Sequence, residues 1–110
     1  MRIDDYQREA MSTASAVDSS SVTVAALGLA GEAGEFADHV KKFIAQGHPI
    51  DHSKLDAEAG DILWYLALYA QATKTTLSNI AAANLSKLRA RYPKGFEAER
   101  SMNREESPLD

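Results

Sequence analysis

The chain of 110 residues contains no cysteine. A disulfide scaffold, a zinc–thiolate site and a cysteine nucleophile are therefore excluded. The chain also lacks any apolar run close to the ~20 residues that span a bilayer. Its N-terminus has no basic region followed by an apolar stretch, which is the pattern of a signal peptide. We therefore expect a cytoplasmic protein with no membrane segment.

β-Branched and large apolar residues are also scarce. Only nine residues are Val or Ile, and Leu, Ile, Val and Phe together number 22, whereas alanine alone occurs 19 times. Alanine and leucine favour helix, and a low content of β-branched residues disfavours sheet. This composition predicts one all-α domain of closely packed helices. Its core is thin, and we expect a homo-oligomer, a dimer or a tetramer, to complete it.

Basic residues do not dominate the charge, because 16 acidic side chains outnumber 12 basic ones and the formal net charge is −4. A broad nucleic-acid-binding surface is usually strongly basic. We therefore expect no nucleic-acid polymer as a partner, although this balance allows a small basic pocket.

Apolar residues recur at helical spacing in four segments. The spacing predicts helices over residues 4–17, 21–46, 53–73 and 76–92. Asp4, Ser53 and Thr76 are the expected N-caps. Gly47 and Pro93 are expected to end the second and fourth helices.

The third segment is apolar nearly all round, which is typical of a helix buried on several sides and predicts a subunit interface. Residues 98–110 are rich in charge and poor in apolar side chains. We predict one folded domain over residues 1–97, followed by a loosely ordered tail.

Two acidic pairs form a near-repeat within the predicted second and third helices. Glu32 and Glu35 stand on one helix, and Glu58 and Asp61 on the next. Ala-Gly separates the members of each pair, and a large apolar residue follows. A spacing of three residues places the members of a pair about 60° apart around the helix. Both pairs border an apolar stripe, so antiparallel packing of the two helices would bring all four carboxylates together.

A single acidic pair at this spacing usually belongs to a solvated helix face. Two matching pairs beside glycines favour a shared site instead. Four partly buried carboxylates repel one another, and they either take up protons or bind cations. Oxygen ligands suit hard cations such as Mg²⁺, with Mn²⁺ as a substitute. Gly28, Gly31 and Gly34 would let a neighbouring backbone approach, or leave room for metal and phosphate groups.

With these pairs, the sequence resembles the MazG-like all-α nucleoside triphosphate pyrophosphohydrolases, over residues 3–96. That family carries E-x-x-E and E-x-x-D on successive helices, and the 22 residues between the pairs fit its spacing. The following helix in the family carries an Asn and a Lys ahead of a basic residue. Asn84, Lys87 and Arg91 match that pattern here.

The resemblance implies a four-helix MazG-like bundle, assembled as dimers or tetramers, that hydrolyses NTPs or dNTPs to the monophosphate and pyrophosphate with Mg²⁺. By this resemblance the four carboxylates hold the metal, and Glu35 also accepts the proton of a water. Asn84, Lys87 and Arg91 lie on one helix face and would bind the phosphates. Nucleotide-pool cleaning is one role that fits this activity.

Other side chains are weaker candidates. Lys41 and Lys42 could reach a phosphate, although a charge pair at a helix end is usually just solvated. Gln7, together with Tyr6, could help to form a base pocket, because first-helix residues line the nucleotide site in some relatives. His39 follows the first acidic pair by four residues and could join the metal site, but a surface role is more usual. Trp64 could stack on a base, although such a residue more often belongs to an interface core.

Three alternative functions share some of these sequence features. A di-iron bundle needs Glu-x-x-His motifs on two helices, and the chain has none. A phosphoribosyl-ATP pyrophosphohydrolase shares the fold and the acidic motifs, so it is a rival at the level of substrate. A non-catalytic helical interaction module would need neither the convergent carboxylates nor the basic face. Calorimetric Mg²⁺ binding would separate such a module from an enzyme.

Overall fold

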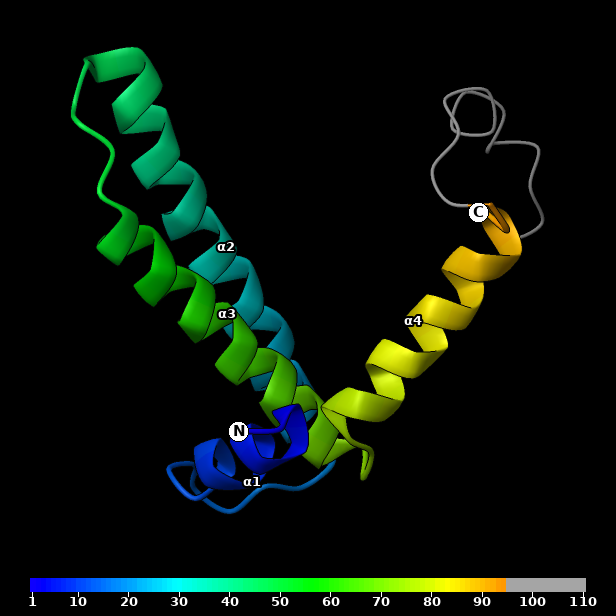
Figure 1. The fold of residues 1–110 in the computed structure, drawn as a ribbon. Coiled ribbons are helices and arrows are strands. Elements are labelled where there is room, and N and C mark those ends of the chain that lie inside the picture. The colour runs from blue at the N-terminus through cyan, green and yellow to red at the C-terminus, as the bar shows by residue number, and fades with distance from the viewer. Residues whose placement is uncertain (95–110) are drawn as a thin grey trace. The chain divides into compact units, whose positions relative to one another are not determined.

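The computed structural model describes residues 1–94, which form four helices and no β-strand (Figure 1). The helices are α1 (Ile3–Met11), α2 (Ser21–Gln46), α3 (His52–Ala72) and α4 (Leu77–Arg91). The all-α class predicted from composition is therefore confirmed. The predicted tail, residues 98–110, and the end of the predicted domain lie outside the described residues. No helix in the described part of the chain is long and apolar enough to cross a membrane.

The chain divides into two units, Met1–Leu77 and the part from Ser78 onward. In the first unit, α2 and α3 form an antiparallel hairpin joined by residues 47–51, and α1 packs against α3 (Figure 1). The second unit contains α4 beyond its first residue. The first unit therefore carries both acidic pairs, and the second carries the predicted phosphate-binding face.

The core of the first unit is built on small side chains. Ala67 and Ala70 are fully buried, Leu77 is nearly so, and partly buried apolar side chains pack around them: Tyr6, Met11 and Leu63. No large side chain is fully buried among the described residues. Alanines at the centre let α1 lie close to α3, but they remove little apolar area from water. The thin core expected from composition is therefore present.

Close packing between α2 and α3 depends on Gly28. A Cβ atom at this position would overlap three atoms of the Tyr65 ring. By contrast, a Cβ at Gly31 or Gly34 would meet no atom of the described residues within 4 Å. Of the three glycines in this part of α2, only Gly28 is thus required by the close approach of the Tyr65 ring of α3.

The first helix ends at Met11, earlier than predicted. The Ser12 hydroxyl donates to the Glu9 carbonyl at 2.5 Å, and the Thr13 hydroxyl donates to the Ala10 carbonyl at 2.6 Å. Hydroxyl groups that bond carbonyls of the preceding turn compete with the backbone N–H groups that would continue the helix. The prediction of a helix as far as residue 17 was therefore wrong.

The other helix ends follow local capping. Gly47 ends α2 with a left-handed φ of 69°, as its position predicted. Asp51, rather than Ser53, caps α3, because its side chain accepts from the Ser53 N–H at 3.1 Å and the Lys54 N–H at 3.3 Å. At the first residue of α4, the Leu77 N–H donates to the side-chain oxygen of Gln7 at 2.8 Å.

Candidate metal centre

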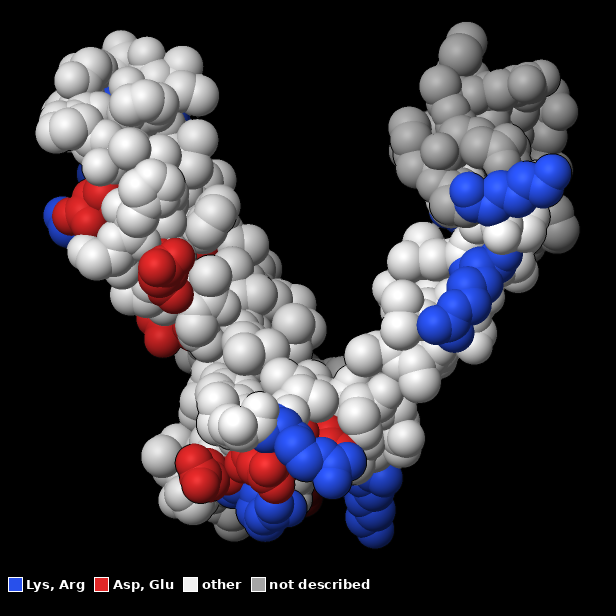
Figure 2. Space-filling view, in the orientation of Figure 1, with Lys and Arg blue, Asp and Glu red and all other residues white. Residues whose placement is uncertain are grey.

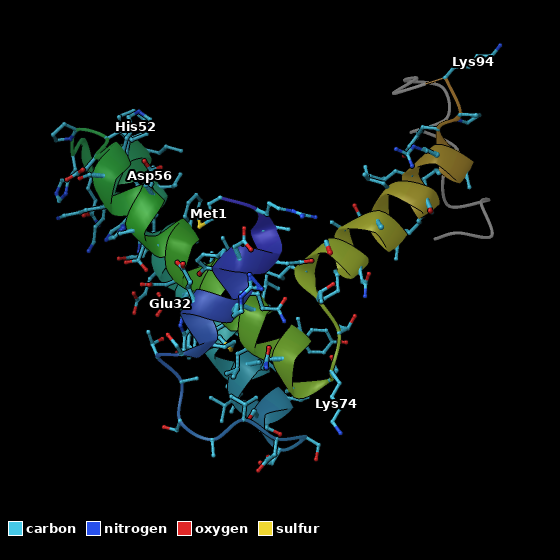
Figure 3. The ribbon with its side chains drawn as sticks, turned by 60° about the horizontal axis from the view of Figure 1, so that its bottom comes forward. Met1, Glu32, His52, Asp56, Lys74 and Lys94 are labelled. Carbon is cyan, nitrogen blue, oxygen red and sulfur yellow. The ribbon has the colours of Figure 1, made fainter. Side chains whose placement is uncertain are left out.

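Three of the four predicted carboxylates meet between α2 and α3. Glu32, Glu58 and Asp61 each offer one oxygen, and these oxygens all lie within 4.8 Å of one another. The antiparallel hairpin places Glu32 opposite the pair on α3, whose spacing of three residues puts both members on one helix face. Figure 2 shows acidic patches along this hairpin, and Figure 3 labels Glu32 between the two ends of the hairpin.

Two oxygens of this centre are buried without a partner. With both carboxylates ionised, Glu32 Oε2 and Glu58 Oε2 are shielded from solvent, and neither accepts a hydrogen bond from a donor among residues 1–94. Buried polar atoms in folded proteins are nearly always partnered. The two oxygens therefore indicate a place for a group that the chain itself does not supply, such as a cation.

The electrostatics of the centre agree with this interpretation. The pKa of Glu32 is raised, chiefly because the protonated form hydrogen-bonds with Glu58, and further because partial burial and the charges of Asp61 and Glu58 disfavour its carboxylate. These causes are those expected when carboxylates crowd together without a counter-charge. A bound cation would remove the repulsion.

Glu35 lies beside the group of three rather than within it. It is exposed, and its hydrogen bond with Glu32 lowers the Glu32 pKa, against the larger effects that raise it. Glu35 therefore contacts the centre from its solvent side. Glu35 and Asp61 are both exposed, whereas Glu32 and Glu58 are partly buried.

The donor set fits Mg²⁺ or Mn²⁺. All three converging groups are carboxylates, which hard cations prefer, and none is the nitrogen or sulfur ligand typical of zinc. A Mg²⁺–oxygen distance of about 2.1 Å places ligands on opposite sides of one ion about 4.2 Å apart. The observed separations need only a small adjustment of flexible side chains to reach that geometry.

An aromatic wall stands next to the carboxylates. Glu32 and Asp61 share a cavity of about 340 Å³ with Trp64 and Tyr65. The two rings meet edge to face with centroids 5.1 Å apart, and Trp64 Nε1 donates to the Thr13 hydroxyl at 3.0 Å. The size falls in the range of about 300–1,000 Å³ that is usual for ligand sites. The structure thus places Trp64 on the wall of the site rather than wholly inside a core.

The first helix contributes two predicted residues with different surroundings. The pKa of Tyr6 is raised by burial and, to a smaller extent, by the charge of Asp61. Gln7 is only 5% exposed, and its amide makes three hydrogen bonds, to Gln71, to the Thr75 carbonyl and from the Leu77 N–H. A nucleotide that bonded Gln7 would have to displace one of these partners.

The remaining predicted residues lie outside the carboxylate group. Lys41 is largely exposed, with its Nζ 3.9 Å from Asp38. Asn84, Lys87 and Arg91 lie on α4, in the second unit. Their spacing along one helix keeps them on a single face.

Comparison with known proteins bears on the same residues. The model of the MazG nucleotide pyrophosphohydrolase domain matches residues 20–96, a segment that contains α2, α3, α4 and both acidic pairs. The chain belongs to the MazG family. It is 36% identical over 105 residues to the Gene 37 protein of Mycobacterium phage L5, across 86% of this chain and 92% of that protein. No solved structure matches the chain.

Two features of this MazG domain were missed from sequence. One is the buried hydrogen-bonded role of Gln7, which a polar residue inside the apolar stripe of the first helix could have signalled. The other is a cavity near the α2–α3 loop, lined in part by His39. Its lining residues are spread over 17 positions of the chain, so no short motif marks it.

Proposed function

We propose that this MazG domain hydrolyses ribo- or deoxynucleoside triphosphates to the monophosphate and pyrophosphate, with Mg²⁺ as its cofactor. The observation that carries the proposal is the convergence of Glu32, Glu58 and Asp61, with two buried oxygens that lack a partner among the described residues. A merely solvated acidic face would leave such oxygens in water. The family match supports the same class of reaction.

In this proposal each carboxylate has a distinct role. Glu32, Glu58 and Asp61 hold Mg²⁺, which when bound offsets phosphate charge and acidifies water. Glu35, exposed at the edge of the centre, accepts a proton from the attacking water. The oxygen of that water forms a bond to the α- or the β-phosphorus, the anhydride bond between the two breaks, and the other product, pyrophosphate or the monophosphate, leaves with the bonding electrons.

Further residues are proposed to bind the rest of the nucleotide. The wall of Trp64 and Tyr65 offers ring surfaces beside the carboxylates, and flat apolar rings suit the stacking of a base. Asn84, Lys87 and Arg91 are proposed to bind the phosphates, with Lys41 as a further cationic group. Gln7 is proposed to shape the base pocket from α1.

We also propose that the domain works as a homo-oligomer. On α2, Leu27 is 71% exposed and Val24 is 58% exposed, and α3 leaves Leu66 and Tyr69 about two-fifths exposed. Exposed apolar side chains on neighbouring helices are typical of surfaces that a partner covers. Light scattering at micromolar concentration should give a mass above that of one chain, and a stable monomer would contradict this part of the proposal.

The decisive experiment is an activity panel. Purified chain is incubated with ribo-, deoxy- and modified nucleoside triphosphates and with phosphoribosyl-ATP, and pyrophosphate release is measured with Mg²⁺, with Mn²⁺ and with a chelator. We expect release from at least one nucleoside triphosphate, and its loss under chelation. Release from phosphoribosyl-ATP alone would move the assignment to that substrate. No release from any of them, together with no calorimetric Mg²⁺ binding, would leave a non-catalytic interaction module.

A further inference from the structure

A second cavity lies at the loop end of the α2–α3 hairpin. It measures about 250 Å³ and is lined by residues from the last turns of α2, the connecting loop and the first turn of α3: His39, Lys42, His48, Pro49, Ile50, Asp51, Lys54 and Leu55. None of the three converging carboxylates lines it. Figure 3 labels His52 near this end of the hairpin, beyond Glu32.

Cationic and potentially cationic groups outnumber acidic ones in the lining. Lys42, Lys54, His39 and His48 contribute four such side chains, against one carboxylate, that of Asp51. That carboxylate already accepts hydrogen bonds from backbone and hydroxyl groups of its own helix turn, which lower its pKa. It therefore remains an anion, and its Oδ1 is engaged by the first turn of α3.

One ring nitrogen of the lining indicates a missing partner. His39 Nδ1 is shielded from solvent and has no hydrogen-bond partner in the described part of the chain. A buried imidazole nitrogen is normally partnered, either as a donor or as an acceptor. The nitrogen does not itself open into the cavity, so the oxygen of a bound anion would accept its hydrogen bond only after the imidazole ring turns.

Lys42 is held in place by a neighbour. Its Nζ lies 3.0 Å from a carboxylate oxygen of Asp38, one helical turn earlier on α2. An ammonium group has three donors, so this ion pair leaves capacity for a ligand. Lys54 stands on the opposite helix, so an anion between the two lysines would bridge α2 and α3.

A metal ion is not the favoured occupant. The described residues contain one group of three potential metal ligands with atoms within 4.8 Å of one another, and that group is the carboxylate centre. His39, His48 and Asp51 do not form such a group, although all three line the cavity. Lysine side chains, which repel cations, stand among them.

We propose that this cavity is an anion site that binds phosphate or pyrophosphate without a divalent metal. Its volume is below the range of about 300–1,000 Å³ that is usual for whole drug-sized ligands, so a phosphate group fits it better than a complete nucleotide. Charge-assisted hydrogen bonds from lysine and imidazole are the usual means of holding such an ion.

The loop-end cavity and the carboxylate centre are separated by similar distances along the two segments of the hairpin. His39 follows Glu32 by seven residues on α2, and Asp51 precedes Glu58 by seven on α3. Seven residues make nearly two turns and about 10 Å of rise along α2, so His39 and Glu32 lie on the same side of that helix, and Asp51 is the N-cap of α3 rather than a residue within it. The anion could thus be a free phosphate, or the phosphate end of a molecule bound at the centre.

The test is a calorimetric titration of the full chain with sodium pyrophosphate, at fixed ionic strength and in the presence of a chelator. We expect binding by the wild type and a dissociation constant about tenfold higher in each of Lys42→Met and Lys54→Met, because a hydrogen bond to a charged group contributes about that much. Lys74→Met, at the opposite end of the hairpin in Figure 3, is the matched control and should bind as the wild type does. Circular dichroism checks the helical content of every variant.

Two outcomes would overturn the anion site. One is the absence of pyrophosphate binding by wild type under chelation. The other is an equal loss in Lys74→Met and Lys42→Met, which would indicate non-specific attraction to surface charge. Asp61→Asn separates this inference from the proposed function. If that variant loses hydrolysis but keeps metal-free pyrophosphate binding, the two sites are distinct, whereas loss of that binding would place the anion at the carboxylate centre and overturn the proposal.

A competition arm identifies the source of the anion. A non-hydrolysable nucleoside triphosphate that displaces pyrophosphate would assign the site to the phosphate end of the substrate or to the product. Simultaneous binding of both would assign it to a free phosphate. If no nucleotide is hydrolysed but the two lysine variants weaken pyrophosphate binding, the anion site stands and the proposed function fails.

Discussion

Two clusters of buried polar atoms in the first unit differ in how fully they are paired. Around Gln7, which is nearly buried, the amide oxygen and nitrogen are both bonded within the protein. At the carboxylate centre and the loop-end cavity, buried atoms of Glu32, Glu58 and His39 have no partner in the part of the chain that the structure describes while the carboxylates are ionised. Since folding alone favours complete pairing, we infer that the Gln7 cluster serves stability and that the carboxylate centre and the cavity serve ligands.

The largest expected difference between the two clusters is in activity. Asp61→Asn and Glu35→Gln each remove a charge at nearly constant volume, and each should lower pyrophosphate release at least about 100-fold, because metal-assisted charge stabilisation is worth several kcal/mol. Helical content should be unchanged. Stability without metal should stay the same or rise, because one repelling charge is gone.

Asp56→Asn is the matched control, since it makes the same change on an exposed part of α3 outside the centre. It should keep wild-type turnover on the same verified substrate. If Asp61→Asn and Glu35→Gln also keep normal turnover, the shared catalytic centre must be abandoned.

The next largest effect belongs to the Gln7 cluster. Gln7→Ala removes both the acceptor of the Leu77 N–H and the donor to Gln71 and Thr75. We expect a loss of about 3 kcal/mol in the free energy of unfolding, because each buried group left unpaired costs about 1–3 kcal/mol. Urea denaturation measures it. Gln46→Ala, at the exposed end of α2, should change stability by no more than about 0.5 kcal/mol, and an equal effect of the two changes would contradict the role given to Gln7.

Substitutions at two glycines of α2 should change stability by smaller amounts and with opposite signs. Gly28→Ala forces a methyl group into the Tyr65 ring, and overpacking of about 1–3 kcal/mol should exceed the gain of about 1 kcal/mol in helix propensity. Gly34→Ala meets open space within the described residues, so it should stabilise the chain by up to about 1 kcal/mol. Thermal unfolding of both variants gives the two signs, and a stabilising Gly28→Ala would show that the ring is free to move.

The sequence predicted much of this arrangement, because its signals are local. The bounds of α2 follow from apolar periodicity and Gly47, and those of α3 and α4 differ from the prediction by one residue at each end. The predicted end of α1 was wrong because apolar periodicity takes no account of side chains that compete for backbone carbonyl groups. The hydroxyl groups of Ser12 and Thr13 bond such carbonyls. Such competition for carbonyl groups can be recognised only from the three-dimensional structure of the turn.

The candidate centre was predictable in part for the same reason. Spacing of three residues fixes a helix face, so the approach of Glu32, Glu58 and Asp61 follows from two helices packed antiparallel. The exposed position of Glu35 depends on how α2 is rotated about its axis, which spacing alone leaves open. The partners of Gln7 lie 64 to 70 positions away along the chain, and contacts at that separation are decided by tertiary packing.

The smallest expected effect is a pH dependence with opposite signs at two carboxyl groups. Glu32 has a raised pKa, so the folded chain holds its proton more tightly than the unfolded chain does. Without metal, that contribution is fully present below the ordinary value of 4.5 and is lost as pH rises through the raised folded value. Asp51 has a lowered pKa because Ser53 and Lys54 hydrogen-bond its carboxylate, so its contribution to stability is present above pH 3.8 and is lost as pH falls.

Urea denaturation of metal-free protein across this pH range tests both signs. The free energy of unfolding should decline less toward neutral pH in Glu32→Gln than in the wild type, because the amide mimics the protonated form. Asp51→Asn, which keeps a good N-cap, should instead flatten the acid side alone. Mg²⁺ added at neutral pH should stabilise the wild type by mass action on the folded state, and less so Glu32→Gln. If Glu32→Gln shows the wild-type pH slope and the wild-type gain with Mg²⁺, then Glu32 is solvated like Asp51, and the contrast between the Gln7 cluster and the carboxylate centre does not hold.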